Sequence, residues 1–234
     1  MKLSLVIPCY NEAANLKLLF EKLDNFRNFS KSIEVIIVDN GSTDNSKDII
    51  KKLLPNYSYV KLVKVKENKG YGNGILEGLE KASNEIIAWT HADLQTDPMD
   101  ALSGLEIFKK NHNPKKIFVK GLRKGRPLLD KFFTIGMAFF EIFLLRKFLW
   151  DINAQPTMFH REFFKTWSLP PKDFSLDLFA YYIAKTQNLY IKRFPVVFGK
   201  RAHGVSHWNI SFSSKLKFIK RTLSFSFNLK KRFK

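Results

Sequence analysis

The stretch Ala88-Trp89-Thr90-His91-Ala92-Asp93-Leu94-Gln95-Thr96-Asp97-Pro98 decides how the rest of the sequence is interpreted. An apolar run at 86–89 ends abruptly in polar side chains that can bind a metal ion. Asp97 and Pro98 then predict a helix start, with the Asp as cap and the Pro at the first helical position. Because an open α/β sheet forms its binding crevice at the carboxyl ends of its strands, we expect a functional site here.

Three side chains in this stretch are candidate metal ligands. Asp93 and Gln95 alternate along what we expect to be extended backbone, so both side chains face one side, and His91 precedes them by two residues. A carboxylate, an amide oxygen and an imidazole can hold Mg²⁺ or Mn²⁺ against a diphosphate. The alternative, for this stretch taken alone, is a polar loop with no ligand role.

Composition restricts the class of protein. A chain of 234 residues can bury one good core, so we expect one domain with an appendage. The single Cys9 excludes a disulfide framework and fits a reducing compartment. The formal net charge of +19 requires an anionic partner, which can be nucleic acid, an anionic membrane surface or a phosphorylated substrate.

We expect neither a signal peptide nor a membrane span. The apolar run near the start, at 3–8, is short and leads directly into polar residues. The best candidate span, at 128–150, carries five charged residues, and its charge-free runs are far shorter than the roughly 20 residues that a span needs. We find no internal repeat.

The first half of the chain alternates strand and helix patterns. Apolar runs at 3–8, 33–38 and 86–89 predict buried strands, residues 60–65 predict a further strand, and each is followed by a helical pattern. This alternation predicts an α/β fold with a mostly parallel sheet and helices on both faces. Polar residues follow each strand, so we expect them to meet at one edge of the sheet: Tyr10 and Glu12, Asp39, Lys69 and Gly70, and Asp93.

Four ordered motifs then become informative: VIPCYNE at 6–12, VDNGSTD at 38–44, NKGYG at 68–72 and ADLQ at 92–95. They resemble the nucleotide-sugar-binding half of the family 2 glycosyltransferases, and most of all the dolichol-phosphate mannose synthase and polyprenyl-phosphate sugar transferase type. The resemblance covers residues 1–125 closely and the remainder loosely. It implies the type A glycosyltransferase fold, a Rossmann-like nucleotide-binding sheet with acceptor elements appended.

The resemblance also implies roles for single residues. Two positions depart from the family pattern. Asn40 stands where a second acid is common, which weakens contacts to the base or ribose. His91 stands where the first Asp of the Asp-x-Asp motif is usual. A neutral imidazole ligates Mn²⁺ but is a poor ligand for Mg²⁺, so the metal preference is affected. The implied donor-site residues are Pro8, Tyr10 and Glu12 in the first nucleotide loop, Asp39 at the base, Lys69 and Gly70 in the donor pocket, and Asp93 and Gln95 at the metal and diphosphate.

The second half supplies candidates for the acceptor side. Arg123 and Arg126 stand where the family places phosphate-binding arginines, although a solvated loop is the alternative. Residues 201–206 resemble the Arg-x-x-Gly-x-Ser loop that closes on donor and acceptor phosphates, which implies roles for Arg201 and Ser206. His207 replaces the usual basic residue after the Ser, so charge there depends on pH.

Two aromatic-rich segments suggest a membrane surface. The segment 128–150 is apolar nearly all round, which predicts a buried core helix or an interfacial helix with Arg146, Lys147 and Trp150 at its end. In the tail, 210–234, basic residues alternate with aromatics, and no acid follows Asp177. We expect the tail to bind an anionic membrane surface. Single-stranded nucleic acid and a soluble, partly disordered tail are the alternatives.

The sequence therefore predicts a nucleotide-sugar-binding part at 1–125, an acceptor-binding part of the same domain at 126–209, and a basic membrane-surface tail at 210–234. The expected reaction is inverting, metal-dependent transfer of a hexose from a GDP- or UDP-linked sugar to a polyprenyl phosphate, at the cytoplasmic face of a membrane. Asp93, Gln95 and Arg201 are the expected catalytic residues. One alternative is transfer to a glycan hydroxyl with Asp177 as base, and another is a non-catalytic nucleotide-sugar or nucleic-acid binder.

Overall fold

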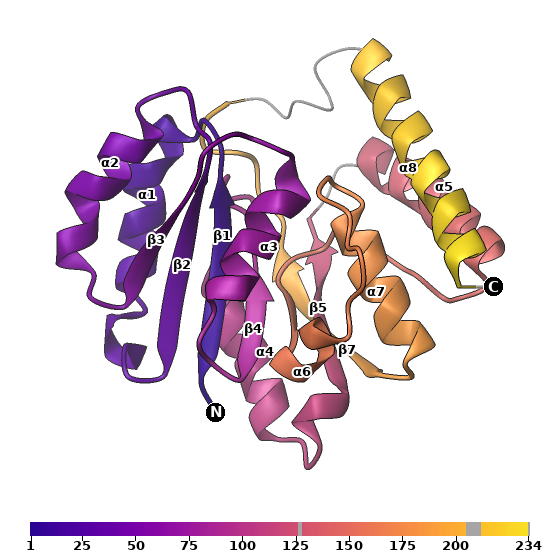
Figure 1. The fold of residues 1–234 in the computed structure, drawn as a ribbon, viewed down its shortest axis with the longest axis horizontal. Helices are drawn as coiled ribbons and strands as arrows, with labels where there is room; N and C mark the ends of the chain where they lie inside the picture. The colour runs from indigo at the N-terminus through magenta and orange to yellow at the C-terminus, as the bar shows by residue number, and fades with distance from the viewer. Residues whose placement is uncertain (126–127, 205–211, 234) are drawn as a thin grey trace.

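The computed structural model describes residues 1–125, 128–204 and 212–233, of which 128–134 and 212–218 are described by their backbone alone. One seven-stranded sheet, in the order β3-β2-β1-β4-β6-β5-β7, organises the molecule (Figure 1). The strands are β1 (Leu3–Cys9), β2 (Ile33–Asn40), β3 (Val60–Val65), β4 (Ile86–Trp89), β5 (Ile117–Lys124), β6 (Thr157–His160) and β7 (Tyr190–Val197).

The predicted α/β architecture is confirmed. β1 pairs in parallel with β2 and β4, and β2 pairs in parallel with β3, so the first four strands end at the same edge. Every residue of β2 is buried, as its continuous apolar run predicts for a strand covered on both faces. The sheet is not wholly parallel, because β6 runs antiparallel to both β4 and β5.

Helices cover both faces of the sheet and bury two separate apolar clusters. One cluster packs α3 and α7 against Val6 and Val38, and the other packs α1 and α4 against Leu5 and Ile7. The helices are α1 (Ala13–Asp24), α2 (Ser46–Leu53), α3 (Tyr71–Lys81), α4 (Asp100–Lys109), α5 (Leu128–Leu145), α6 (Arg161–Lys165), α7 (Leu176–Thr186) and α8 (Phe212–Arg232), with short 3-10 turns at Arg27–Phe29, Leu54–Asn56 and Pro114–Lys116.

The start of α4 differs from the prediction. The helix begins at Asp100 rather than at Pro98. The Asp97 carboxylate accepts a hydrogen bond from the Met99 amide at 2.9 Å, and the Asp97 carbonyl accepts one from the Asp100 amide at 3.0 Å. Asp97 therefore caps a tight turn that precedes the helix, as Asp side chains commonly do.

The C-terminal segment forms a helix that packs on the domain. α8 lies beside α5 at the edge of the molecule far from β3 (Figure 1). Ser226 on α8 donates a hydrogen bond of 2.6 Å to the Glu141 carboxylate on α5, and both residues are fully buried. Leu229 joins the core cluster around α7. None of the helices in the described ranges combines the length and the apolar character needed to cross a membrane.

Candidate functional site

The loops after β1 and β2 are bonded into one unit. Asn11 has a left-handed backbone, with φ of 55°, and its side-chain oxygen accepts a hydrogen bond of 2.8 Å from the Thr43 amide. The Glu12 amide donates to the Ser46 hydroxyl at 3.0 Å, and the Ala13 amide donates to the Asp44 carboxylate at 3.2 Å. The loops after β1 and β2 thus hold each other in place.

A pocket of about 370 Å³ opens beside the end of β2. Asp39 is buried in its wall, and one carboxylate oxygen accepts a hydrogen bond of 3.0 Å from the Ser42 amide. The second oxygen has no such bond to Ser42, so it can accept from an N–H group of a ligand. Pro8 and Tyr10, at the end of β1, are both half-buried. The pocket is lined by Asp39, Gly41, Ser42, Lys47, Lys64, Val65 and Lys66.

Asn40 connects β2 to the glycine-containing third loop. Its side-chain amide donates a hydrogen bond of 2.9 Å to the Gly70 carbonyl, and it is almost completely buried. A carboxylate at this position could not donate that bond, which gives a structural reason for the departure from the family acid. Gly70 has a φ of 114°, and a Cβ there would clash with the carbonyl of Lys172. Lys69, just before it, is exposed.

Asp93 and Arg201 form the centre of the site. The Arg201 guanidinium lies 2.8 Å from one Asp93 carboxylate oxygen and 3.9 Å from the Glu12 carboxylate. The segment carrying Arg201 is bonded across the strand ends, because the Gly199 amide donates to the Gln95 carbonyl at 2.8 Å and Asn15 donates to the His203 carbonyl at 3.3 Å. Elements far apart in sequence therefore converge on one edge of the sheet.

The charged groups around Arg201 lie partly out of solvent. Burial raises the pKa of Glu12, although the hydrogen bond from Asn15 and the nearby Arg201 oppose that shift. The Nε atom of Arg201 is buried and has no hydrogen-bond partner among the described residues. A guanidinium with a free buried donor, held beside two carboxylates, is suited to receive an anionic ligand such as a diphosphate.

The backbone around Gln95 differs from the prediction. Residues 93–95 form a turn rather than extended chain, because Leu94 has a φ of 59° and Asp93 accepts a hydrogen bond of 3.1 Å from the Gln95 amide. The expectation that Asp93 and Gln95 alternate along a strand was wrong for this reason. The Gln95 side-chain amide instead donates to the Gly199 carbonyl at 3.3 Å.

The His91 ring stacks on Tyr71, with centroids 5.3 Å apart and planes 23° from parallel. Across the described ranges, no three His, Cys, Asp or Glu side chains gather closely enough to hold a metal ion. Asp93 therefore offers one carboxylate. That fits a divalent ion whose other ligands are diphosphate oxygens and water, which is how Mg²⁺ usually binds in such sites.

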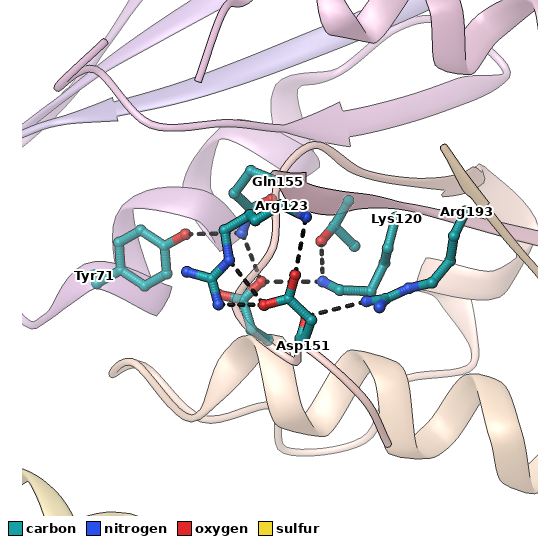
Figure 2. A network of polar contacts seen from close by, with 8 residues as sticks. Tyr71, Lys120, Arg123, Asp151, Gln155 and Arg193 are labelled. Atoms are coloured by element: carbon teal, nitrogen blue, oxygen red, sulfur yellow. Dashed lines mark hydrogen bonds and ion pairs between the residues drawn. The ribbon is translucent and has the colours of Figure 1, made fainter. Parts of the chain in front are cut away.

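A second, buried polar network lies around the second half of β5 and the start of β6 (Figure 2). The Lys120 ammonium is fully buried, donates to the Thr157 hydroxyl at 2.6 Å and lies 3.6 Å from the Asp177 carboxylate. Gln155 donates to the same carboxylate at 2.7 Å. Burial lowers the pKa of Lys120 to about 8, against the opposing effect of Asp177. Asp177 is therefore held by two donors inside the protein.

Arg123 belongs to the same region. Its side chain donates to the Asp151 carboxylate at 2.8 Å, its amide donates to the other oxygen at 3.0 Å, and Arg193 donates to the Asp151 carbonyl at 3.0 Å (Figure 2). Burial alone would raise the pKa of Asp151. The Arg123 guanidinium outweighs that effect and holds the pKa of Asp151 below its ordinary value. An acceptor role for Arg123 stays a prediction. Arg126, Ser206 and His207 lie outside the described residues.

Sequence reasoning missed five members of this network: Tyr71, Lys120, Asp151, Gln155 and Arg193. One of them left a signal in the sequence. Lys120 lies inside the otherwise apolar run 117–122, and a charged residue within a buried strand requires a buried partner. The sequence pattern could not identify Asp177 as that partner, because Asp177 is 57 positions away in the chain and only the fold brings the two residues together.

Comparison with known proteins identifies related sequences. Residues 4–167 match the family model described as glycosyl transferase family 2. Dolichol-phosphate mannosyltransferase of Pyrococcus furiosus is 34% identical over 98 residues, which is 42% of this chain and 27% of that protein. Poly-beta-1,6-N-acetyl-D-glucosamine synthase of Staphylococcus epidermidis is 32% identical over 139 residues, 58% of this chain and 32% of that protein. The match thus spans about a third or less of these relatives.

Solved structures share the fold over nearly the whole chain. Glucosyl-3-phosphoglycerate synthase from Mycobacterium tuberculosis, in complex with Mn²⁺, UDP and phosphoglyceric acid, has a TM-score of 0.73 at 17% identity and covers 98% of this chain and 78% of its own. Mannosyltransferase PcManGT from Pyrobaculum calidifontis, in complex with GDP-Man and Mn²⁺, has a TM-score of 0.65 at 18% identity. The match covers 97% of this chain and 64% of that protein's chain. The predicted type A glycosyltransferase fold is confirmed.

Proposed function

This chain belongs to glycosyl transferase family 2, and on that basis we propose that it transfers a hexose from a GDP- or UDP-linked donor to the phosphate of a polyprenyl carrier. The observation that carries the proposal is the ion pair between Arg201 and Asp93 at 2.8 Å, at the edge where the donor motifs converge. A cation already sits against the carboxylate proposed to face the donor diphosphate. Donors of both kinds, and Mn²⁺, are named with the structural neighbours.

The proposed donor site runs along the carboxyl edge of the sheet. Asp39 accepts from the base, and the loop with Lys69 and Gly70 borders the donor pocket. Asp93 would hold a Mg²⁺ or Mn²⁺ ion, which would supply positive charge to the leaving diphosphate. Gln95 and His91 belong to the proposed metal site by sequence position, and their side chains would have to turn away from Gly199 and Tyr71 to act as ligands.

The acceptor determines what the protein must do. A phosphate monoester has its second pKa near 6, so it is anionic at neutral pH and needs no protein base. An acceptor phosphate oxygen attacks the anomeric carbon while the bond from that carbon to the donor diphosphate breaks, and its electron pair leaves with the diphosphate. Attack opposite the leaving group inverts the centre. Arg201 is suited to stabilise the charge that develops on the diphosphate oxygens.

The hydroxyl-acceptor alternative requires a base, and Asp177 is poorly placed for that role. Its carboxylate is 2% exposed and is held by Gln155 and Lys120. A base must reach the proton that it removes. The name of the dolichol-phosphate relative favours a lipid phosphate, and the name of the poly-N-acetylglucosamine relative keeps a glycan acceptor as an outcome to be tested.

The proposed location is peripheral, at the cytoplasmic face of an anionic membrane. Phe139 and Phe143 lie one turn apart on α5, so they share a side, and they are 66% and 88% exposed. Phe227 on α8 contacts the Phe140 ring and is 50% exposed. Lys231 on α8 is exposed as well. Exposed aromatics beside basic residues suit a headgroup layer.

The experiment that tests this function compares two matched acceptors. The full chain is incubated with labelled UDP- and GDP-hexoses and with vesicles that contain either polyprenyl phosphate or the corresponding polyprenol, with Mn²⁺, Mg²⁺ or EDTA. We expect label in the organic-soluble fraction only when the vesicles contain polyprenyl phosphate and a divalent ion is present. Only one of the two donor classes should supply that label. Transfer to a hydroxyl acceptor instead would support the alternative reaction. Saturable donor binding without any transfer would support a non-catalytic binder.

A further inference from the structure

A continuous stack of side chains connects the C-terminal helix with the metal-side loop. The Tyr71 ring lies between His91, at 5.3 Å, and Phe174, at 4.7 Å with planes only 9° apart. The Arg221 guanidinium of α8 lies 5.7 Å from the centre of the Phe174 ring. Four segments that are distant in sequence therefore meet in one column: the loop after β4, the start of α3, the loop before α7, and α8.

Polar contacts hold the same segments together. Arg221 lies 3.4 Å from the Asp173 carboxylate, and the Asn73 amide of α3 donates to the Lys172 carbonyl at 2.8 Å. A Cβ at Gly72 would lie 2.6 Å from the Asp173 carbonyl oxygen. The loop 171–174 is therefore packed directly against the first turn of α3, with no space between them.

The column has a middle ring, Tyr71, that contacts the buried network, and an accessible outer end. Tyr71 is half-buried, and its hydroxyl lies 3.5 Å from the Gln155 amide of the buried network. Burial raises the pKa of Tyr71 well above its ordinary value, with Asp177 and Asp93 adding to the effect. At the outer end, Phe174 is 39% exposed and the Arg221 side chain is 43% exposed. Changes on α8 can therefore reach Tyr71 and His91 through the Phe174 ring.

We propose that Arg221 of α8 is a positioning residue for the donor site, acting through Phe174 on Tyr71 and His91. Tyr71 directly follows Lys69 and Gly70, and His91 lies two residues before Asp93, so the column borders both loops of the proposed donor site. In this arrangement His91 serves as the inner ring of the column. α8 is then a part of the nucleotide-binding structure rather than a separable tail.

The direct test is hydrogen exchange on the full chain without any ligand. Arg221→Ala should speed amide exchange in peptides covering 68–75 and 90–96, and Phe174→Ala should do the same. Phe174→Tyr keeps the ring and should behave as wild type. Lys220→Ala is the matched control, because Lys220 is the exposed neighbour of Arg221 on the same helix. Unchanged exchange at both peptides in Arg221→Ala would overturn the proposal.

A second measurement separates positioning from bulk stability, and it rests on the proposed donor function. Calorimetry with UDP and with GDP, in Mn²⁺, should show about 3- to 10-fold weaker binding for Arg221→Ala, the range for one partly exposed cation–π contact. The melting temperature should stay within about 2 °C, as for most surface substitutions. The double variant with Phe174→Ala should lose no more affinity than Phe174→Ala alone, because the two residues act in series.

The outcomes distinguish the inference from the function. If wild type binds neither nucleotide but Arg221→Ala still loosens 68–75, the donor function fails and the positioning role stands. If wild type binds a nucleotide and Arg221→Ala changes neither affinity nor exchange, the positioning role fails and the function stands. Additive losses in the double variant would also contradict action through Phe174.

Discussion

At the scale of single residues, Asp93 uses its two carboxylate oxygens differently. One accepts a hydrogen bond from the Gln95 amide and shapes the turn, and the other pairs with Arg201. Asp93→Asn keeps an acceptor for the turn but removes the charge. We expect transfer to fall by about 100-fold or more, the usual loss when a group that stabilises developing charge is removed. Initial rates measure this, with the exposed Asp48→Asn on α2 as control. Turnover like that of wild type would contradict the role given to Asp93.

Asp39 should determine nucleotide affinity. Asp39→Asn preserves an oxygen for the Ser42 amide and removes the charge that faces the pocket. We expect affinity for the preferred nucleoside diphosphate to weaken by about 1–3 kcal/mol, the contribution of a hydrogen bond to a charged group. Calorimetry measures the change. Asp48, whose side chain is 79% exposed, is again the control, since Asp44 caps Ala13 and is not neutral to the site. Equal losses of nucleotide affinity at Asp39 and Asp48 would mean that the nucleobase binds elsewhere.

Single residues also show where a sequence pattern is insufficient. The motifs predicted roles for Asp39, Asp93 and Arg201 through the family resemblance, and the structure places the three residues at the carboxyl edge of the sheet. They could not show that His91 stacks on Tyr71, or that Asn40 donates to Gly70, since both contacts depend on how separate loops pack. The left-handed conformation of Leu94 was equally hidden, because only Gly and Asn signal that conformation clearly in a sequence.

At the scale of elements, apolar runs predicted strands well. The bounds 86–89 agree with β4, whose four residues are all apolar and buried, as expected for a strand covered on both faces. The bounds 60–65 agree with β3, although two lysines interrupt that strand and most of its residues are not fully buried. The antiparallel direction of β6 was not predictable, because its four residues carry no information on orientation. The start of α4 was displaced because Asp97-Pro98 serves a turn as readily as a helix cap.

The contact between α5 and α8 should make stability depend on pH. Burial raises the pKa of Glu141 from 4.5 to about 7, while the hydrogen bond from Ser226 opposes the shift. Between these values the folded protein holds a proton that the unfolded chain has released. The free energy of unfolding should therefore fall as pH rises from about 4.5 to 7, by up to about 3 kcal/mol.

Glu141→Gln tests this pH dependence. The amide can still accept from Ser226 but does not titrate, so the variant should lack this part of the pH dependence and be more stable than wild type at pH 8. Urea unfolding of both proteins at pH 5 and pH 8 measures the difference. The result that contradicts the account is the same change in unfolding free energy between the two pH values for both proteins.

At the scale of the whole molecule, the exposed aromatics of α5 should mediate membrane binding. Deleting α8 is a poor test, because Ser226 and Leu229 are buried in the domain. Phe143→Ser removes an aromatic side chain of α5 that is 88% exposed instead, and Leu18→Ser on α1 is the control. We expect the affinity for anionic vesicles, measured by co-sedimentation, to weaken by about tenfold or more for Phe143→Ser. This is the loss expected when one aromatic side chain is no longer buried in the membrane. Binding should also weaken with salt. Equal binding by both variants would contradict the proposed surface.

The central claim is that separate loops form one nucleotide-sugar site along the carboxyl edge of the sheet. Hydrogen exchange of the full chain, with and without the preferred nucleoside diphosphate and Mn²⁺, tests it most directly. The account predicts joint protection of peptides covering 39–46, 68–72, 91–96 and 199–204, with little change in α5. Protection confined to one of these segments, or centred on α5 and α8, would contradict it.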